Sequence, residues 1–372
     1  MPIFVVTLHQ INTLTQEQIS FNIINTLNQI IMEENLENLE EFDRGLLSEI
    51  NGEYYFNDLE PQEPDSCQAP QEPEICVAPM GNRDLNISMA RSKVSAKVLK
   101  HLGLVVYSDP AIRDSRSWLL QSLLNELEYP LTPDGYFGEK TKKQVEKFQT
   151  ACHLVADGKV GENTWAELIY RGKCKISNSK ITQQDFEDAA KELYVEVAVV
   201  KAVTEVEAGG SGYLFSNHPT ILFEGHVFYK LLNNSKLLPK LNKENENILY
   251  PKWTKSHYIG GVGEYDRLQK ARWINRDAAN KSASWGLFQI MGNNFAACGC
   301  STVEEFVQRM CKSESEQLRL FVAFIQHNKL DRFLRNKDWA GFAYRYNGAG
   351  YGINEYDKKL MNAYNKHKKQ SK

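Results

Sequence analysis

Three glutamates stand close together in the run "KAVTEVEAGGSGYLFSNHPTILFEGH", residues 201–226. Glu205 and Glu207 are two residues apart before a glycine cluster, and Glu224 follows an apolar run. A carboxyl group in apolar surroundings can act as a general acid, and a second carboxyl can activate water or stabilise positive charge. The first question is which of the three is an ordinary surface charge.

Helical spacing separates the first two glutamates. Counting back four and seven residues from Glu207 reaches Val203 and Val200, so Glu207 is expected on the buried face of a helix. Glu205 falls on the more polar flank and is expected to be a surface charge. Desolvation and the negative end of the helix dipole should both raise the pKa of Glu207, as a general acid near neutral pH requires. The alternative is a buried glutamate that is hydrogen-bonded for structural reasons.

The elements around these glutamates follow from local signals. Thr182 and Asp185 resemble a capping box, and the helical pattern after them runs to Gly209-Gly210, which fits a glycine C-cap. If residues 220–223 form a short strand, Glu224 emerges at its end, where the wall of a cleft is expected. We therefore take Glu224 as the candidate second carboxylate.

Several alternatives to this assignment stay open. Glu224 and His226 could instead form a salt bridge or hydrogen bonds that fix a loop. Glu264 and Asp266 in "GEYDRL" are weaker candidates for the second carboxylate.

Charge divides the 372-residue chain into two unlike parts. Residues 1–90 hold sixteen Asp or Glu and two Arg, whereas residues 91–372 hold 42 basic and 31 acidic residues. A basic body suits an anionic polymer such as cell wall or nucleic acid, although a solubilising surface explains the charge as well. No motif supports a nucleic-acid partner. Five prolines between residues 61 and 79 indicate an extended acidic linker, so a domain boundary is expected near residue 90.

Signals for export and metal binding are weak. The N-terminus "MPIFVVTLHQ" lacks the basic region and cleavage site of a signal peptide, and no apolar run is long enough for a membrane span. Seven cysteines without a CxxC pair favour reduced, mostly buried thiols and folding in a reducing cytosol. We expect no metal and no cofactor.

Residues 108–170 contain an internal repeat. "DGYFGEKT" and "DGKVGENT" begin at Asp134 and Asp157 and share the pattern D-G-x-[FV]-G-E-x-T. Asp-Gly favours a tight turn, the second glycine permits a further bend, and Thr141 and Thr164 are expected to be helix N-caps. Val145 and Phe148 share one face of the helix between the two turns. The repeat predicts a small three-helix bundle.

This repeat resembles the helical peptidoglycan-binding domain found beside many cell-wall hydrolases. The resemblance includes Leu120 and Gln121 and rests on a set of motif residues: Asp134, Gly135, Gly138, Phe148, Gln149, Asp157, Gly158, Gly161 and Trp165.

Residues 180–368 resemble the N-acetylmuramidase family often found in phage endolysins, within the lysozyme-like superfamily. The resemblance rests on "EVEAGGSGYLF", "ILFEGHVFY", "YPKW", "SWGLFQIMG" and "RYNGAGY", with Ala208 where serine is commoner. It implies cleavage of the glycosidic bond between N-acetylmuramic acid and N-acetylglucosamine, with Glu207 as the general acid. It also implies substrate-binding roles for Gln289, Tyr346 and Asn347. The rings of Trp285 and Tyr351 could stack on sugars or belong to the core.

Other activities compete with this hypothesis. A lytic transglycosylase uses the same acid but forms anhydromuramic products. A metallopeptidase could use His218, Glu224, His226 and His257, although no HExxH is present. A non-catalytic wall-binding protein is the third alternative.

The sequence thus predicts a mainly α protein with a small β element. Its parts are an acidic segment over 1–90, a peptidoglycan-binding domain over 91–175 and a catalytic domain over 176–372. We expect a monomer that is made in the cytoplasm without a signal peptide and acts on glycan strands of the wall after release. Release through a holin and injection into a rival cell both fit, and in the second case residues 1–90 would contact a delivery or immunity partner.

Overall fold

The computed structural model describes residues 90–208, 210–347 and 355–370. Helices dominate it, and five short strands form a two-stranded and a three-stranded antiparallel sheet. This confirms the prediction of a mainly α fold with a small β element. The acidic N-terminal segment up to residue 89, with its proline-rich linker, lies outside the described residues.

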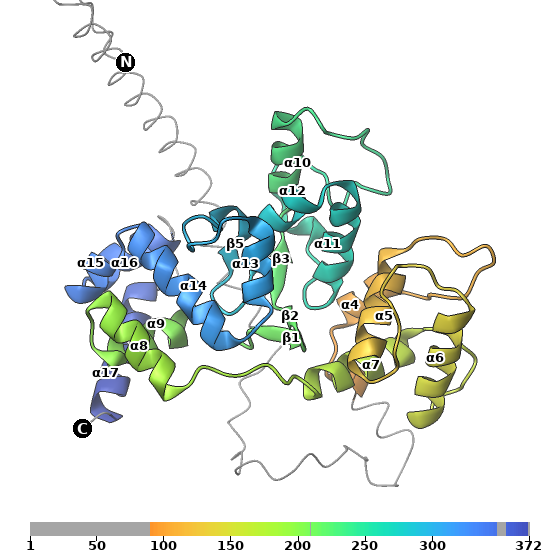
Figure 1. The fold of residues 1–372 in the computed structure, drawn as a ribbon, viewed down its shortest axis with the longest axis horizontal. Helices are drawn as coiled ribbons and strands as arrows, with labels where there is room; N and C mark the ends of the chain where they lie inside the picture. Colours follow the sequence, from red (N-terminus) through yellow and green to blue (C-terminus); the bar gives the residue numbers. More distant parts are fainter. Residues whose placement is uncertain (1–89, 209, 348–354, 371–372) are drawn as a thin grey trace, which may run out of the picture.

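Four helices form a bundle at one end of the molecule (Figure 1). They are α4 (Ala96–Leu102), α5 (Ser115–Glu126), α6 (Glu139–Ala151) and α7 (Glu162–Cys174). Helix α5 starts at Asp114, whose side chain accepts a hydrogen bond from the amide of Arg116. Leu119, Leu123 and Val145 are fully buried between the helices. The bundle therefore contains the three helices that the repeat predicts, together with the short α4.

Two buried glutamine side chains hold the two Asp-Gly turns of the bundle. Gln121 Oε1 accepts the amides of Asp134 and Gly135, and its Nε2 donates to Thr141 Oγ1. The second repeat uses an equivalent set of contacts, in which Gln149 bonds Asp157, Gly158 and Thr164. Each glutamine thus ties a turn to the start of the next helix.

The predicted N-caps of these helices are wrong. Gly138 and Gly161 are the N-caps of α6 and α7, and the two threonines lie three residues further on, inside the first turns. Thr141 and Thr164 are buried and accept hydrogen bonds from the glutamines instead. The physical reason is that a glutamine from the preceding helix competes for the hydroxyl, which a purely local pattern does not show.

The remaining motif residues of the bundle have packing roles. Phe148 and Trp165 are buried, and the Trp165 indole donates to the carbonyl of Gly103 at 2.9 Å. Gly135 and Gly158 have positive φ angles of 88° and 70°, a region in which a side chain is strained.

Helices also dominate the second part of the chain, in which α8, α9 and α14 to α17 gather at the opposite end from the bundle (Figure 1). Its helices are α8 (Gln183–Leu193), α9 (Val197–Glu207), α10 (Gly225–Asn234), η1 (Lys255–His257), α11 (Gly263–Ile274), α12 (Arg276–Lys281), η2 (Gly292–Asn294), α13 (Val303–Met310), α14 (Glu314–His327), α15 (Asp331–Arg335), α16 (Trp339–Asn347) and α17 (Tyr356–Gln370). The capping box of Thr182 and Asp185 is present at the start of α8. The helical pattern is interrupted at Tyr194, which has left-handed backbone angles, before α9 begins. Helix α9 packs against both α8 and α17.

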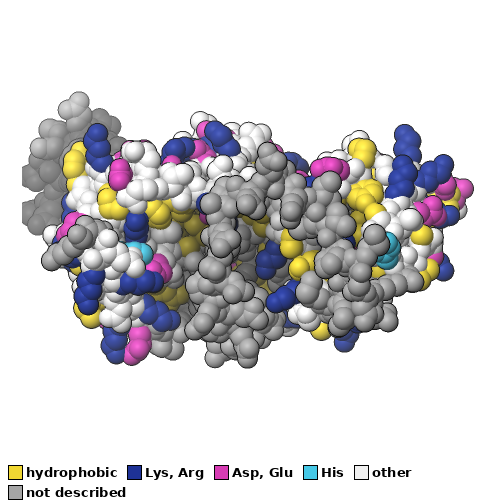
Figure 2. Space-filling view, turned by 90° about the horizontal axis from the view of Figure 1, so that it is seen from below, with side chains coloured by type: hydrophobic (Ala, Val, Ile, Leu, Met, Phe, Trp, Pro, Cys, Tyr) yellow, Lys and Arg dark blue, Asp and Glu magenta, His cyan; other side chains and the backbone are white. Residues whose placement is uncertain are grey.

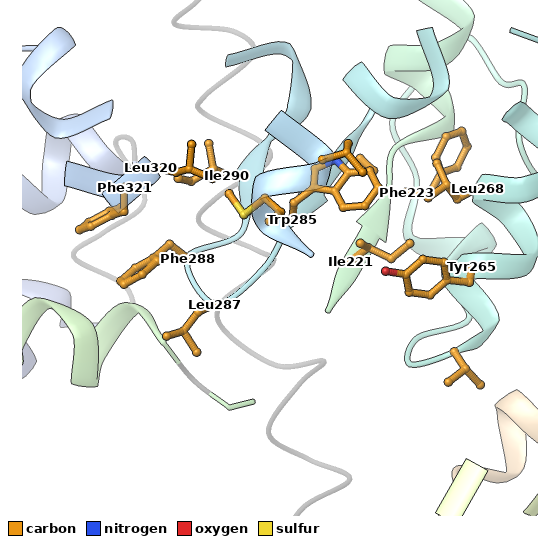
Figure 3. Packing of buried hydrophobic residues seen from close by; sticks show 14 of the residues in the cluster. Ile221, Phe223, Tyr265, Leu268, Trp285, Leu287, Phe288, Ile290, Leu320 and Phe321 are labelled. Atoms are coloured by element: carbon orange, nitrogen blue, oxygen red, sulfur yellow. The ribbon is translucent and has the colours of Figure 1, made fainter. Parts of the chain in front are cut away.

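The strands are β1 (Tyr213–Phe215), β2 (His218–Pro219), β3 (Ile221–Phe223), β4 (Ala283–Trp285) and β5 (Ile290–Met291). β1 pairs with β2, and β4 is the central strand between β3 and β5. Ile221 lies opposite Trp285, which lies opposite Ile290. Figure 3 shows Trp285 in the middle of the buried apolar cluster that these strands share with α11 and α14. The strand predicted before Glu224 is therefore present, and "SASWGLFQIMG" forms a hairpin.

Buried polar contacts join the bundle to the second part of the chain. Asp266 of α11 has no exposed surface, and it accepts hydrogen bonds from Ser115 of α5 and from His101 Nε2 of α4 at 2.8 Å. Lys270 Nζ lies 3.3 Å from the same carboxylate. Arg113 stacks on Trp273 with 4.2 Å between guanidinium carbon and ring centre. Asp266 is thus a link between the two parts, and this position does not suit a second catalytic carboxylate.

Asp266 also predicts a pH dependence of stability. Burial disfavours its ionised form, but hydrogen bonds from His101 and Ser115 and the charge of Lys270 outweigh burial and hold the pKa of Asp266 below its usual value. A carboxyl with a depressed folded-state pKa stabilises the fold above the unfolded-state pKa of about 4, and this stabilisation is lost as pH falls through the folded value. Thermal unfolding of wild type and Asp266→Asn should therefore differ at pH 7 and converge in acid. If the difference in melting temperature between the two proteins stayed constant from pH 7 into acid, ionisation of Asp266 would not be its cause.

Two further features concern the described helices and the surface charge. No helix in the described ranges is long and apolar enough to cross a membrane. Figure 2 shows Lys and Arg side chains at both ends of the molecule, with Asp and Glu side chains among them.

Five cysteines lie in the described part and are free thiols, of which Cys174 is exposed. Burial raises the pKa of Cys152 and of Cys298 to about 12, so both stay protonated at neutral pH.

Candidate active site

Glu207 is the last residue of α9, and 7% of it is exposed. It shares the buried face of the helix with Val200 and Val203, as the spacing predicts. Ala208 is the C-cap and has a negative φ of −91°, which any residue can adopt. The helix therefore ends one residue before the predicted glycine cap. Gly209 lies outside the described residues. A buried carboxyl therefore stands at the carbonyl end of a helix.

Glu205, two residues earlier, has the opposite environment. It is exposed, and it bonds Lys366 Nζ at 3.1 Å and His367 Nε2 at 2.7 Å on α17. Although partial burial opposes ionisation, these two hydrogen bonds hold the pKa of Glu205 below its usual value. Glu205 is an ionised surface carboxylate, which agrees with the prediction.

Glu224 follows β3 and precedes α10, with no exposed surface. The hydroxyl of Tyr258 donates to its carboxylate, with distances of 2.9 Å to Oε1 and 2.7 Å to Oε2. His226 Nδ1 lies 3.3 Å from Oε2 without hydrogen-bond geometry. Trp253 Nε1 donates in turn to Tyr258 at 3.0 Å. In this arrangement the carboxylate fixes the segment around 253–258, which is the alternative that the sequence left open.

The hairpin of β4 and β5 holds Gln289 in a turn with a positive φ of 48°. Its Oε1 accepts from Ser284 Oγ at 2.8 Å, and its Nε2 donates to the carbonyls of Gly286 and Thr220. Gln289 is half-buried, so its amide mainly fixes the turn that connects the hairpin to β3.

Trp285 is 1% exposed, and its indole donates to the carbonyl of Asn280 at 3.0 Å. The suggestion that its ring stacks on a sugar is wrong, since the ring belongs to the core.

Tyr346 is the only aromatic residue of "RYNGAGY" that lies within the described part. It is 6% exposed, its hydroxyl donates to the carbonyl of Phe288 at 3.1 Å, and its ring stacks on Phe342. Phe288 in turn stacks on Phe321 of α14 with 4.2 Å between ring centres (Figure 3). The hydrogen bond from Tyr346 to Phe288 brings "RYNGAGY" against "SWGLFQIMG". Asn347 is the last residue of α16, and Tyr351 lies outside the described residues.

The histidines of the metallopeptidase alternative pack against aromatic rings, and His226 and His257 share the ring of Tyr250. His218 stacks on Phe215 with 3.9 Å between ring centres, and burial lowers its pKa to about 4. His257 stacks on Tyr250. In the ranges that the structure describes, no three His, Cys, Asp or Glu side chains are placed to hold a metal ion. The metallopeptidase alternative therefore has no geometric support in this part of the chain.

Comparisons with known proteins match both parts of the chain. Residues 196–368 match the Muramidase family, described as N-acetylmuramidase, and residues 117–168 match a putative peptidoglycan binding domain. Residues 196–368, which are just under half of the chain, are thus similar to the N-acetylmuramidase family. The muramidase match begins just before α9 and ends within α17, so it includes Glu207, Glu224, Gln289 and Tyr346.

Two individual proteins are also similar to this chain. The crystal structure of Burkholderia AP3 phage endolysin is 35% identical and covers 73% of this chain and 100% of that chain, with a TM-score of 0.49. An uncharacterized protein in the bpoA1 3' region of Kitasatospora aureofaciens is 53% identical over 51 residues. That match covers 13% of this chain and 42% of the Kitasatospora protein, so the chain spans less than half of this relative.

The muramidase domain also contains a buried ion pair that sequence reasoning missed. Glu264 and Arg267 are both fully buried, with 2.7 Å between Oε2 and Nη1. The Glu264 carboxylate also accepts the amides of Phe223, Ile259 and Gly260. Glu264 is therefore a structural carboxylate, and its weaker candidacy for catalysis is wrong. The spacing of three residues in "EYDR" suits an ion pair, but burial of both groups depends on distant chain segments.

Proposed function

We propose that this protein is a peptidoglycan hydrolase that cleaves the glycosidic bond between N-acetylmuramic acid and N-acetylglucosamine. The observation that carries the proposal is a buried carboxyl, Glu207, at the end of α9 within an N-acetylmuramidase domain. Glycosidic cleavage requires protonation of the leaving oxygen, because an alkoxide leaves poorly. Glu207 supplies this proton as the general acid.

Other residues shape the site around this acid. Gln289 fixes the hairpin turn against Thr220, and Tyr346 holds α16 against Phe288 of the hairpin, with Asn347 at the end of α16 beside the substrate. Glu224 acts through Tyr258 as a positioning residue, because its own carboxylate has no exposed surface. Water attacks the sugar carbon once the acid has donated its proton, so a single reactive carboxyl is sufficient.

The organisation of the chain fits attack on an insoluble wall. The domain over residues 91–175 holds the enzyme on peptidoglycan, and the domain over 176–372 cuts the glycan strands. The resemblance to a phage endolysin supports a lytic role after release from the cytoplasm. Residues 1–90 serve delivery, through a partner that recognises their acidic character.

The experiment is digestion of purified cell walls with an assay for new reducing ends, in an excess of chelator. We expect reducing ends to appear at the same rate with and without the chelator. New amino groups without reducing ends would identify a peptidase or amidase and contradict the proposal. Soluble glycan without reducing ends would favour the lytic transglycosylase.

A further inference from the structure

Two cavities in the described part of the chain are not lined by Glu207. One lies in the bundle beside the second Asp-Gly turn. The other has a volume of about 320 Å³ and lies at the junction between the bundle and the muramidase domain. Trp118 of α5 lines it from the bundle, and His218, Arg272, Arg276 and Gln308 line it from the muramidase domain. We call this second space the junction cavity.

Arg272 provides the hydrogen-bond donors that a ligand in the junction cavity would contact. A guanidinium carries five N–H donors. In the described residues, only its Nε has a protein acceptor, Asn280 Oδ1 at 2.8 Å. The guanidinium carbon lies 5.7 Å from the centre of the Trp285 ring. Its terminal nitrogens are therefore available to an acceptor that enters the cavity.

The charges around the junction cavity do not balance. Arg276 is satisfied by Glu304, with 2.7 Å between Nη2 and Oε1. Burial lowers the pKa of His218 to about 4 and raises the pKa of Cys311 to about 11, so both are neutral at pH 7. Burial and the nearby Arg276 lower the pKa of Arg272 to about 10, which leaves it cationic. Two guanidinium groups thus face one carboxylate.

We propose that the junction cavity binds a stem-peptide carboxylate of peptidoglycan through Arg272. A guanidinium binds carboxylates through two parallel hydrogen bonds, and its planar shape makes this pairing stronger than that of an ammonium group. The uncompensated positive charge favours an anion, and the indole of Trp118 closes the cavity from the bundle. The inference rests on the proposed function, since it assumes that wall polymer is the substrate.

The position of the junction cavity determines how this interaction affects the choice of substrate. Arg272 and Asp266 both belong to α11, the helix on which the bundle rests. A stem peptide held there contacts the bundle and the muramidase domain at once. The substrate would then be selected for peptide-bearing strands over bare glycan.

The test uses the full chain with Glu207→Gln, so that the ligand is not cleaved. Calorimetry compares a peptidoglycan tetrasaccharide that carries its stem peptides with the same fragment after conversion of its carboxylates to amides. We expect the native fragment to bind about tenfold more tightly, as one charge-assisted hydrogen-bonded pair provides. Arg272→Gln should remove this preference. Gln308→Glu should also remove it, because it places a negative charge at an exposed position on the cavity wall.

Asn336→Asp is the matched control, since it creates the same kind of charge on an exposed residue outside the cavity. It should keep the full preference. Equal binding of both fragments by the parent protein would overturn the proposal, and so would a preference that survives in Gln308→Glu. Because Gln308 is exposed, this arm does not depend on whether Arg272→Gln folds. Release of reducing ends by the wild-type enzyme is measured separately, so failure here leaves the hydrolase proposal standing.

Discussion

Replacing Glu207 with glutamine is expected to lower the rate of cell-wall clearing by about 10²–10⁴-fold, the usual contribution of a general acid. Glutamine has nearly the same shape, so the buried face of α9 that position 207 shares with Val200 and Val203 should persist. It has no acidic proton, so the leaving sugar oxygen must depart without protonation. The measurement is the loss of turbidity of purified walls at equal enzyme concentration.

Glu205→Gln is the matched control for this variant. It makes the same chemical change two residues away on the same helix, but at an exposed position. It removes surface ion pairs with Lys366 and His367, which contribute little to stability. Its rate should stay close to that of the wild type. Equal activity of Glu207→Gln and Glu205→Gln would show that Glu207 is not the acid.

The second large effect is expected on stability, from Glu264→Gln. This carboxylate accepts the amides of Phe223, Ile259 and Gly260 and the guanidinium of Arg267, and all four donors point at it. An amide nitrogen in place of one oxygen points N–H donors at these N–H donors, and the loss of the negative charge leaves a buried cation unpaired. Loss of one partner of a buried ion pair costs roughly 3–5 kcal/mol of unfolding free energy.

Urea unfolding of the full chain measures this loss. Asp277→Asn is the control, because it breaks an exposed pair with Lys281 in which 65% of the Asp277 side chain is accessible. Its unfolding free energy should change by less than about 1 kcal/mol. If Glu264→Gln changed stability as little as this control, the buried pair would not hold the segment around 259–267 to β3.

Local patterns in the sequence predicted the features that depend on neighbouring residues. The period of an α-helix separated Glu207 from Glu205, because three to four residues return to the same face. The capping box at Thr182 and the short strand before Glu224 also depend on residues within one turn or strand, and both are present.

Contacts between distant segments were not predictable in the same way. Trp285 is a core residue because β3 and β5 flank its strand, and no local signal distinguishes it from an exposed ring. The caps of α6 and α7 were wrong because Gln121 and Gln149 reach across the bundle to the threonines. Asp266 joins two parts of the chain through Ser115, which stands 151 residues earlier.

The most direct test of the central claim is digestion of purified walls in water enriched in oxygen-18, followed by mass spectrometry of the soluble fragments. If Glu207 protonates the leaving oxygen and water completes the cleavage, each new N-acetylmuramic acid reducing end carries one heavy oxygen. Glu207→Gln should release almost no such fragments. Fragments that end in anhydromuramic acid without label, or labelled ends that Glu207→Gln releases as fast as the wild type, would contradict the account.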